Sequence, residues 1–426
     1  MESRLRVGRR ERREVGDSGR GMAWADVPVA EMPPPLYPDV GVIALVPDRW
    51  SWFWQPRHHV MQRLAAFFRV AWMHPAPEWR NSYRGGPRSS GVREVPGLVL
   101  YDPPRYLPTI YRPAALARML HRARVGQARR LLRRLGARRF ALYLWRPTYA
   151  AALETSHDLS VYHIDDDYSF DPGRVGVSDE ERALIRRVDR VVIHSSGLMA
   201  LKGDLHPRTS LVPNGVDYRT FSEARPEPDD LAGIPRPRIG YAGWLKPQLD
   251  WELLDRVATA APDWSFVLVG PTKAPERSGP ALASLATRSN VHFLGPKTPL
   301  ELAVYPQHFD VCVMPYQVNA YTDCIYPLKL HEYLASGRPV VGSPIRSLVE
   351  LAPVIGLART PEEWLAVLGV ALREAGDPRA ARARQAVARA HDWWTITGRI
   401  AELIAEGLGL EDPERIGERA EGLVGA

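Results

Sequence analysis

A lysine and a glutamate, Lys329 and Glu332, open the stretch "LKLHEYLASG", which the sequence predicts to be a helix. Residues at this spacing share one helix face, and the free N–H groups of a first turn attract anions. Lys329 would add a positive charge suited to a diphosphate, and Glu332 could accept two hydrogen bonds from a vicinal diol such as a ribose. The same spacing is also typical of a solvent-exposed ion pair that contributes about 0.3 kcal/mol. Spacing alone favours the exposed pair.

Three adjacent carboxylates, Asp165 to Asp167, follow the apolar run "LSVYHI". Such neighbours repel one another, so at least one should have a raised pKa unless a cation neutralises it. A carboxylate of raised pKa can take a proton from a substrate, so this acidic run could supply a general base. Acidic clusters after strands are also common as helix caps and turns. Both interpretations remain open.

A glycine turn in "GYAGWLK" (240–246) is a further candidate for phosphate binding. Gly243 would let the backbone approach an anion closely, and Lys246 stands nearby. The chain has neither GxGxxG nor GxxxxGK[ST], so the dinucleotide and P-loop classes lose support. A glycine at a strand end is more often only a turn.

The elements that must position these residues alternate between short apolar runs and helical stretches in both halves of the chain. In the first half the runs include "GVIALVPD", "FALYLW", "LSVYHID" and "RVVIHSS", and in the second "RIGYAGW", "SFVLVGP" and "VCVMPY". This alternation predicts an α/β fold with two Rossmann-like, doubly wound parallel sheets facing a cleft at their carboxyl ends. We expect an N-terminal arm (1–38), a first domain (39–217), a linker (218–237), a second domain (238–390) and a C-terminal helix with its tail (391–426).

Composition describes an ordinary globular protein. Of its 426 residues 25% are charged and 45% hydrophobic, and no run approaches the roughly 18 apolar residues of a membrane-spanning helix. The first 21 residues lack an apolar core and so do not form a secretory signal; a disordered arm and an over-extended start both remain open. Cys312 and Cys324 occur without a CxxC or Cys/His cluster, which favours a reducing cytoplasm and gives no support to a structural zinc site.

Several motifs together resemble the group 1 type of bacterial glycosyltransferases, family 4-like enzymes with the glycosyltransferase B fold. "PLKLHEYLASGRPVV" (327–341) resembles their nucleotide-sugar helix, "LVPNGVDYRTF" (211–221) their interdomain crossing, and "NVHFLGP" with "HFDVCVMPY" their base-recognition loop and the next strand. "WSWFWQPRHHVMQRLA" (50–65) is similar to the opening of a subset that builds surface polysaccharides and teichuronic-type polymers. The resemblance covers most of the chain and implies that the C-terminal helix returns to the first domain.

The resemblance implies a set of donor-binding residues. Gly243 and Lys329 would contact the donor diphosphate and Glu332 the ribose, with further donor contacts from Trp244, Lys246, Gly270, Gly295, Pro296, Lys297, Tyr326, Pro327 and Leu328. The aromatic opening would contribute an acceptor site made of Trp54, Gln55, Arg57 and His58, although a lone histidine is usually structural. "VYHIDDDYSF" is similar to the segment that carries the base in xanthan glucuronosyltransferase. This similarity implies Asp166 as the base, with Asp165 as the second candidate. The family context implies no metal and no cofactor.

The chain departs from the family pattern at Cys324, where many retaining members have a glutamate that touches the transferred sugar. A thiol does not replace a carboxylate acceptor. Either a neighbour such as Asp323 takes over, or the reaction inverts the sugar. We therefore expect inversion.

Positive charge is concentrated in one region of the first half. Between Arg49 and Arg146 there are 20 arginines against three acids, and the stretch 112–139 holds ten arginines without an acid. Nucleic acid is one possible partner, but no nucleic-acid motif accompanies the run. The family context favours contact with the anionic inner leaflet of the plasma membrane, where basic residues and tryptophan bind. Compositional bias toward arginine is the remaining alternative, because no lysine precedes Lys202.

These observations predict a cytoplasmic, peripherally membrane-bound glycosyltransferase that moves a sugar from a nucleoside diphosphate donor, UDP favoured, to a glycan or lipid-linked acceptor. Two alternatives remain: a nucleotide-sugar epimerase of the same fold, and a non-catalytic scaffold that binds a nucleotide sugar or an anionic surface. The oligomeric state is open.

Overall fold

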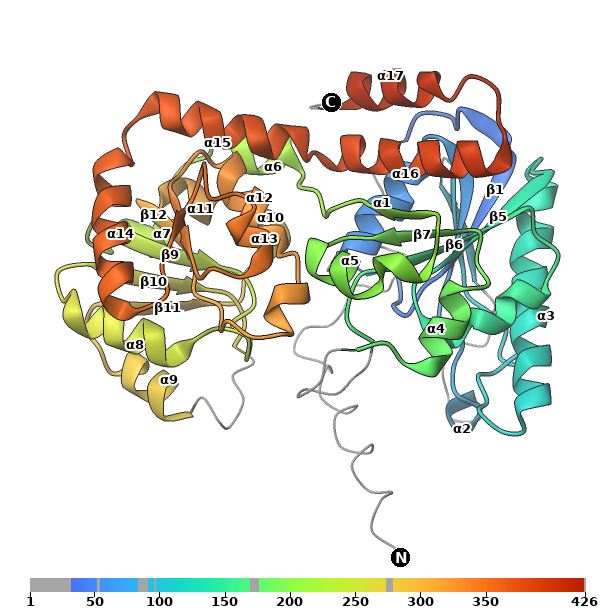
Figure 1. Ribbon diagram of the computed structural model, residues 1–426, viewed down its shortest axis with the longest axis horizontal. Helices are drawn as coiled ribbons and strands as arrows, with labels where there is room; N and C mark the ends of the chain where they lie inside the picture. The colour runs from blue at the N-terminus through green and yellow to red at the C-terminus, as the bar shows by residue number, and fades with distance from the viewer. Residues whose placement is uncertain are drawn as a thin grey trace, which may run out of the picture.

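The computed structural model describes residues 32–51, 54–82, 91–95, 97–168, 176–272 and 279–424. Within them, two mainly parallel sheets form separate domains that lie side by side (Figure 1). This confirms the predicted α/β architecture. Residues 1–31 of the expected N-terminal arm, and Trp52 and Phe53 of the aromatic opening, lie outside the described residues. No helix in the described part of the chain is long and apolar enough to cross a membrane.

The first sheet has eight strands in the order β3-β4-β2-β1-β5-β6-β7-β8. Every pair is parallel except β3 with β4, which is antiparallel at the edge. The apolar runs of the first half form these strands because a sheet covered on both faces buries both sides of each strand. The strands are β1 (Tyr37–Leu45), β2 (Phe68–Met73), β3 (Val92–Val95), β4 (Leu98–Tyr101), β5 (Arg139–Leu144), β6 (Leu159–Ile164), β7 (Arg190–Ile193) and β8 (Thr209–Leu211).

Helices cover both faces of this sheet, and each face has its own apolar core. One core joins the sheet to α1 (Pro56–Leu64), α16 (Trp393–Leu408) and α17 (Glu414–Leu423). The other core joins it to α3 (Ala114–Arg134), α4 (Asp179–Ile185) and α5 (Ser196–Lys202). The shorter helices are α2 (Trp79–Ser82), η3 (Pro147–Glu154) and η4 (Gly203–Leu205).

The second sheet has six parallel strands in the order β11-β10-β9-β12-β13-β14, around a single core. Its strands are β9 (Arg238–Ala242), β10 (Ser265–Val269), β11 (Val291–Gly295), β12 (Val311–Met314), β13 (Val340–Gly342) and β14 (Gly356–Leu357). Its helices are α8 (Trp251–Ala260), α9 (Gly279–Ala286), α10 (Pro299–Leu302), α11 (Tyr305–His308), η6 (Thr322–Cys324), α12 (Leu328–Ala335), α13 (Arg346–Val349), α14 (Pro361–Glu374) and α15 (Pro378–Ala390).

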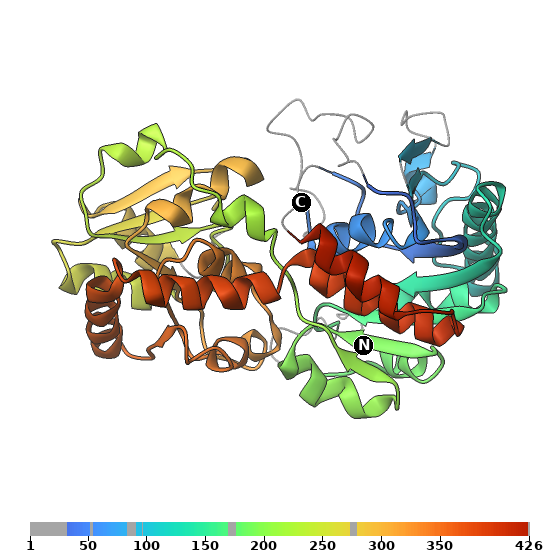
Figure 2. The ribbon, with the colours of Figure 1, turned by 90° about the horizontal axis from the view of Figure 1, so that it is seen from above.

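The chain passes between the domains twice, and the two passages touch. Val216 pairs with Asp392 in a parallel bridge. A Cβ atom on Gly215 would lie only 2.8 Å from the Trp393 ring, so glycine is what lets the passages approach. Beyond Trp393, α16 lies over the first sheet with α17 alongside it (Figures 1 and 2). The expected return of the C-terminal helix is thereby confirmed.

The segment expected to be a linker contains local structure. It holds α6 (Tyr218–Ser222) and α7 (Asp229–Ala232). Leu231 of α7 is fully buried in the core of the second domain. One buried leucine is too weak a periodic signal to predict a helix from sequence. The exact domain limits stay a prediction.

Candidate active site between the two domains

Two glycine turns after β9 and β10 make room for the side chain of Lys329. Gly243 has a φ of +140° and Gly270 a φ of +134°, a conformation that favours glycine. A Cβ atom on Gly243 would collide with the Lys329 side chain, and one on Gly270 would collide with the carbonyl of Gly243. The two turns therefore stack, and Lys329 lies across them.

Lys329 is a partly buried cation whose ammonium lies 5.4 Å from the ring centroid of Tyr241. Among the described residues it forms no hydrogen bond and no ion pair within 4 Å. Burial lowers the pKa of Lys329 to about 8, Glu332 opposes this shift, and Lys246 adds to it. Burial also raises the pKa of Glu332, against the attraction of Lys329. Lys329 and Glu332 are thus partly desolvated polar groups that could bind a ligand.

The start of α12 is open to an anion as well. Pro327 is the N-cap residue, and no side chain caps the helix. The Leu330 N–H bonds the Pro327 carbonyl, which leaves the earlier N–H groups of the first turn to other partners. Charge and helix polarity therefore act in the same direction at this point.

On the first domain, Asp165 is held by two partners. Arg57 Nη1 lies 2.5 Å from its Oδ2, and the Tyr168 hydroxyl donates to its Oδ1. Burial raises the pKa of Asp165, but Arg57 and Tyr168 more than offset this and hold it below the ordinary value. Asp165 is therefore a poor base. Its contacts with Arg57 and Tyr168 hold the loop in place.

Asp166 has the opposite environment. Burial and the neighbouring charge of Asp165 raise the pKa of Asp166. Its Oδ1 accepts the Asp167 N–H at 2.8 Å and the Tyr321 hydroxyl at 3.4 Å. Asp167 is instead buried and pairs with Lys202 at 3.5 Å. Asp166 thus contacts the second domain through Tyr321.

The loop before α12 touches the first domain at further points. The Ser195 hydroxyl donates to the Cys324 carbonyl at 2.6 Å, and Asn214 Nδ2 donates to the Tyr326 carbonyl at 2.9 Å. A Cβ atom on Gly197 would collide with the Asp323 carbonyl. The first domain and the approach to α12 are thus in contact at several points, as a shared site between the domains requires.

Comparison with known proteins agrees with this geometry. Residues 236–366 match the family model "Glycosyl transferases group 1". A Bacillus subtilis protein named as a teichuronic acid biosynthesis glycosyltransferase, TuaH, is 34% identical over 188 residues. That match covers 43% of this chain and 47% of TuaH, so the similarity spans about half of each protein.

Solved structures of similar shape cover more of the chain. A sucrose-phosphate synthase from Thermosynechococcus elongatus matches with a TM-score of 0.61 at 16% identity, over 86% of this chain and 98% of that one. A trehalose-6-phosphate structure from E. coli with bound UDP-2-fluoro glucose matches with a TM-score of 0.60 at 11% identity, over 87% and 99%. At these identities the likeness shows the fold alone, which is the glycosyltransferase B fold.

Residues 236–366 form a group 1 glycosyltransferase domain. Lys329, Glu332 and the two glycine turns all lie within these residues. The resemblance that the sequence motifs indicated is thereby confirmed.

The other residues expected to contact the donor differ in how far they are available to a ligand. Gly295 has open space where a Cβ would stand, Pro296 is exposed, and Trp244 is partly buried with its carbonyl bonded to the Tyr241 hydroxyl at 3.0 Å. Lys297 is directed elsewhere, because its ammonium lies 2.7 Å from Asp230 of α7. Binding a nucleotide through Lys297 would require breaking that pair.

The remaining members of the expected donor set lie next to the domain contact. The Tyr326 hydroxyl is 2.8 Å from His331 Nε2, so its ring is fixed within the group 1 domain. Leu328 is partly buried against the core of the first domain. Both residues therefore support the position of α12 in this conformation.

The residues expected to bind the acceptor make contacts within the first domain. Arg57 bridges Asp48 and Asp165. His58 is buried, its ring centroid is 4.5 Å from that of Trp72, and burial lowers its pKa to about 4. The Gln55 N–H donates to His58 Nδ1 at 3.1 Å. Trp54 is partly buried and stacks on His58. Contact of these residues with an acceptor stays a prediction.

Cys324 is buried among apolar residues of the first domain. Burial raises its pKa to about 11, so it stays a neutral thiol. Asp323, the proposed substitute carboxylate, accepts the Arg346 N–H at 3.2 Å with its Oδ1. Position 324 thus carries a neutral thiol, and one carboxylate oxygen of Asp323 is bonded to the backbone of α13.

Two residues near Asp166 escaped sequence reasoning. His194 follows β7 as Asp165 follows the adjacent strand β6, and its Nδ1 lies 3.1 Å from the Ile164 carbonyl. The rule that parallel strands end at one sheet edge could have identified it. Tyr321 comes from the other domain, and nothing in the sequence pairs it with Asp166.

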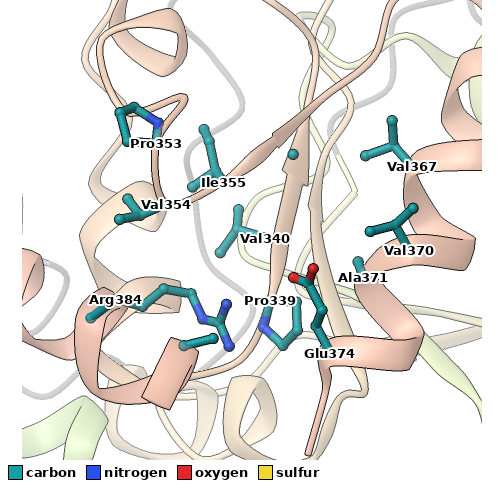
Figure 3. Close-up of a pocket in the computed structure, with 13 residues that line it drawn as sticks. Pro339, Val340, Pro353, Val354, Ile355, Val367, Val370, Ala371, Glu374 and Arg384 are labelled. Carbon is teal, nitrogen blue, oxygen red and sulfur yellow. The ribbon is translucent and has the colours of Figure 1, made fainter. Parts of the chain in front are cut away.

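The hollow drawn in Figure 3 lies elsewhere. Its volume is about 300 Å³, and Val340, Ile355, Val367, Glu374 and Arg384 are among its walls (Figure 3). None of the expected site residues lines it. Among the described residues, no three His, Cys, Asp or Glu side chains gather as a metal site requires. Independence from metal stays a prediction.

Proposed function

We propose that the chain transfers a sugar from a nucleoside diphosphate sugar, UDP favoured, to a glycan or lipid-linked acceptor during surface-polysaccharide synthesis. The observation that carries this proposal is the meeting of Asp166 with the loop that leads to Lys329. The name of TuaH, which refers to teichuronic acid biosynthesis, supports the polysaccharide class. The UDP-2-fluoro glucose bound to the E. coli protein supports a UDP donor.

On the donor side, Lys329 and the open start of α12 would bind the diphosphate. Their positive charge would stabilise the negative charge that grows on the diphosphate as the bond from the anomeric carbon to its oxygen breaks. Glu332 would accept hydrogen bonds from the ribose diol. The Gly243 turn would let the backbone approach the same phosphates, since no side chain stands there.

On the acceptor side, Asp166 would act as the general base. It would take the proton of the acceptor hydroxyl as that oxygen attacks the anomeric carbon. Its raised pKa suits this task better than the lowered pKa of Asp165. Arg57 and Asp165 would position the loop without touching the substrate.

A base in this position fits a single displacement, which inverts the anomeric carbon, and we propose inversion on that ground together with Cys324. The comparisons give inversion no support. One similar structure, of a trehalose-6-phosphate synthase, is described as that of an enzyme that transfers a glycosyl group with retention. Proton NMR of the first product, compared with the donor anomer, tests the point, and a retained configuration would exclude Asp166 as the base of a single displacement.

The basic first domain would hold the protein at the inner face of the plasma membrane, where a polyprenyl-linked acceptor would be found. Product analysis with purified protein tests the activity as a whole. Transfer from UDP-sugar to acceptor, undiminished by EDTA, is the expected result. An epimerised sugar without acceptor would instead favour an epimerase, and nucleotide binding without turnover would favour a scaffold.

A further inference from the structure

The hollow of Figure 3 has apolar walls and opens to the solvent. It lies in the second domain, beside β13, β14, α14 and α15. Val340 and Ile355 are buried walls, whereas Val370 of α14 is 45% exposed and stands at the mouth. The volume of about 300 Å³ equals that of about ten water molecules and is at the lower end for ligand pockets. The hollow therefore has room for a small molecule with an apolar body.

Arg384 of α15 is a buried cation in the wall of this hollow. The residue is only 5% exposed, and its Nε donates to the Gly337 carbonyl at 3.0 Å. Among the described residues neither of its Nη atoms has a hydrogen-bond partner, and the guanidinium forms no ion pair within 4 Å. Burial lowers the pKa of Arg384, and the charge of Glu374 is the first influence that opposes this shift. Because a buried charge with unused donors is costly, a carboxylate that accepts two hydrogen bonds would stabilise it.

Glu374, the last residue of α14, supplies the opposite charge. Its side chain is exposed, and in the described part of the chain it makes no hydrogen bond and no ion pair. Figure 3 shows Glu374 and Arg384 directed toward the same part of the hollow from α14 and α15. The other lining residues are valine, isoleucine, alanine, proline and glycine. The hollow thus contains one cation and one anion that do not pair with each other.

These two charges decide between classes of ligand. A purely apolar molecule would leave Arg384 without a partner. A simple carboxylate would bring a second negative charge close to Glu374, and a simple amine would bring a second positive charge close to Arg384. A zwitterion offers a carboxylate to Arg384 and an ammonium group to Glu374. An α-amino acid with a branched apolar side chain carries both groups together with a body that suits the apolar walls.

We infer that the hollow between α14 and α15 is a binding site for a small apolar zwitterion of the branched-chain amino acid class. The ligand carboxylate accepts hydrogen bonds from the Nη atoms of Arg384, and the ligand ammonium donates to Glu374. The apolar side chain of the ligand packs against Val340, Val367 and Val370. The site uses none of the residues proposed for sugar transfer, so the inference does not rest on that proposal.

The hollow adjoins the end of α12 that lies away from Lys329. Arg384 bonds Gly337, which follows α12, and Gln385 Nε2 donates to the Ala335 carbonyl at 3.3 Å. Lys329 stands at the start of the same helix, roughly 10 Å away at 1.5 Å per residue. A zwitterion at Arg384 and a nucleotide at Lys329 would therefore occupy opposite ends of one helix and would not compete.

Titration calorimetry of the full chain with three matched probes tests the site. The probes are L-leucine, 4-methylpentanoate, which lacks the ammonium group of leucine, and 3-methylbutylamine, which lacks its carboxylate. L-leucine should bind at least about tenfold more tightly than either of the others, because each of them lacks one charge-assisted hydrogen bond. A saturating concentration of UDP should not displace L-leucine.

Variants of the lining residues assign each contact. Glu374→Gln should weaken L-leucine about tenfold without weakening 4-methylpentanoate, whereas Arg384→Gln should weaken both. Val370→Trp should fill the mouth of the hollow and abolish binding. Val349→Trp is the matched control, because Val349 of α13 is 48% exposed but does not line the hollow, and it should bind L-leucine as wild type does.

Thermal melts show which variants are folded. Should Arg384→Gln fail to fold, Glu374→Gln and Val370→Trp still decide the question, because both change exposed side chains. The inference would be overturned by equal affinity of wild type for the three probes or by no binding of L-leucine. Displacement of L-leucine by UDP, or equal binding of L-leucine by Val370→Trp and Val349→Trp, would overturn it as well.

Discussion

Asp165 and Asp166 are neighbours in the chain, yet their carboxylates have opposite environments. Arg57 pairs with Asp165 and stabilises its ionised form, whereas burial and the neighbouring charge of Asp165 raise the pKa of Asp166. Pairs of carboxylates whose pKa values are pushed apart are typical of sites in which one residue exchanges protons and the other orients it. The division of roles therefore follows from the partners of Asp165 and from the burial of Asp166.

Replacing Asp166 by Asn tests this division. We expect kcat to fall roughly 100- to 10,000-fold, since the amide cannot accept the proton. Nucleotide-induced thermal stabilisation should stay as in wild type, because the donor residues are untouched. Steady-state kinetics with matched thermal melts checks both, and near-normal transfer by Asp166→Asn would assign the base elsewhere.

We expect Lys329 to make nucleotide affinity depend on pH. Its pKa in the folded protein is about 8, against an ordinary value of 10.5, so the free protein loses this charge as pH rises through about 8. Between these two values the unfolded chain binds the extra proton, so this group makes the ligand-free protein more stable with rising pH. UDP needs the charged form, so its affinity should fall over the same range.

Titration calorimetry with UDP between pH 7 and 9.5 measures the effect. This range extends about one and a half pH units above the pKa of Lys329 in the folded protein. Lys329→Met should bind UDP about ten- to a hundredfold more weakly at pH 7, as expected for a lost charge-assisted hydrogen bond. Its remaining affinity should no longer fall with pH. A parallel decline in wild type and variant would show that another group is responsible.

The sequence predicts individual residues well where local order along the chain determines their place. Lys329 and Asp166 follow strands at the edge where parallel sheets bind ligands, and this position can be inferred from the apolar runs alone. Lys297 also follows such a strand, but its pairing with Asp230 depends on α7, because Asp230 lies 67 residues earlier in the chain. Tyr321 depends on the docking of two domains. Contacts between residues so far apart in the chain leave no periodic pattern in the sequence.

At the scale of elements, the turns after β9 and β10 position the Lys329 side chain together with the helix that follows β12. Gly243→Ala should force the Lys329 side chain from its position and weaken UDP binding more than tenfold. Gly136→Ala is the matched control, because Gly136 also has a positive φ, +103°, but a Cβ there would have no neighbour closer than 3.9 Å. Both variants should lose about 1–2 kcal/mol of stability to backbone strain. Equal UDP affinity in the two would contradict a steric role for Gly243.

Most elements could be predicted from hydrophobic period, and the failures have physical causes. Continuous apolar runs such as "FALYLW" predict buried parallel strands, and β5 is one. β14 has two residues and β3 is a short edge strand with charged residues, so neither has enough apolar contrast to be seen. α7 is stabilised by one buried leucine, which explains why the sequence pattern favours a linker there.

At the scale of the whole molecule, the two domains are joined where Gly215 meets Trp393. Gly215→Ala would place a methyl group 2.8 Å from the Trp393 ring and 2.9 Å from the His391 carbonyl. The Trp393 ring belongs to α16, which is packed on the first domain. The steric overlap can therefore be removed only if one of the two passages between the domains moves. We expect a loss of roughly 1–3 kcal/mol, as for other overpacked sites.

Thermal melts measure this loss. Gly126→Ala, inside α3 with no atom within 4 Å of its Cβ, is the control and should be neutral or slightly stabilising. A melting temperature of Gly215→Ala equal to that of Gly126→Ala would show that the passages adjust without cost.

The most direct test of the proposed diphosphate site at the start of α12 is thermal stabilisation by nucleoside diphosphates. A ligand that binds only the folded state raises its stability by RT ln(1 + [L]/Kd). UDP should raise the melting temperature of wild type and of Asp166→Asn alike, and should raise that of Lys329→Met clearly less at the same concentration. Stabilisation by none of UDP, GDP, dTDP and ADP, or an undiminished effect of UDP on Lys329→Met, would contradict a diphosphate site at the start of α12.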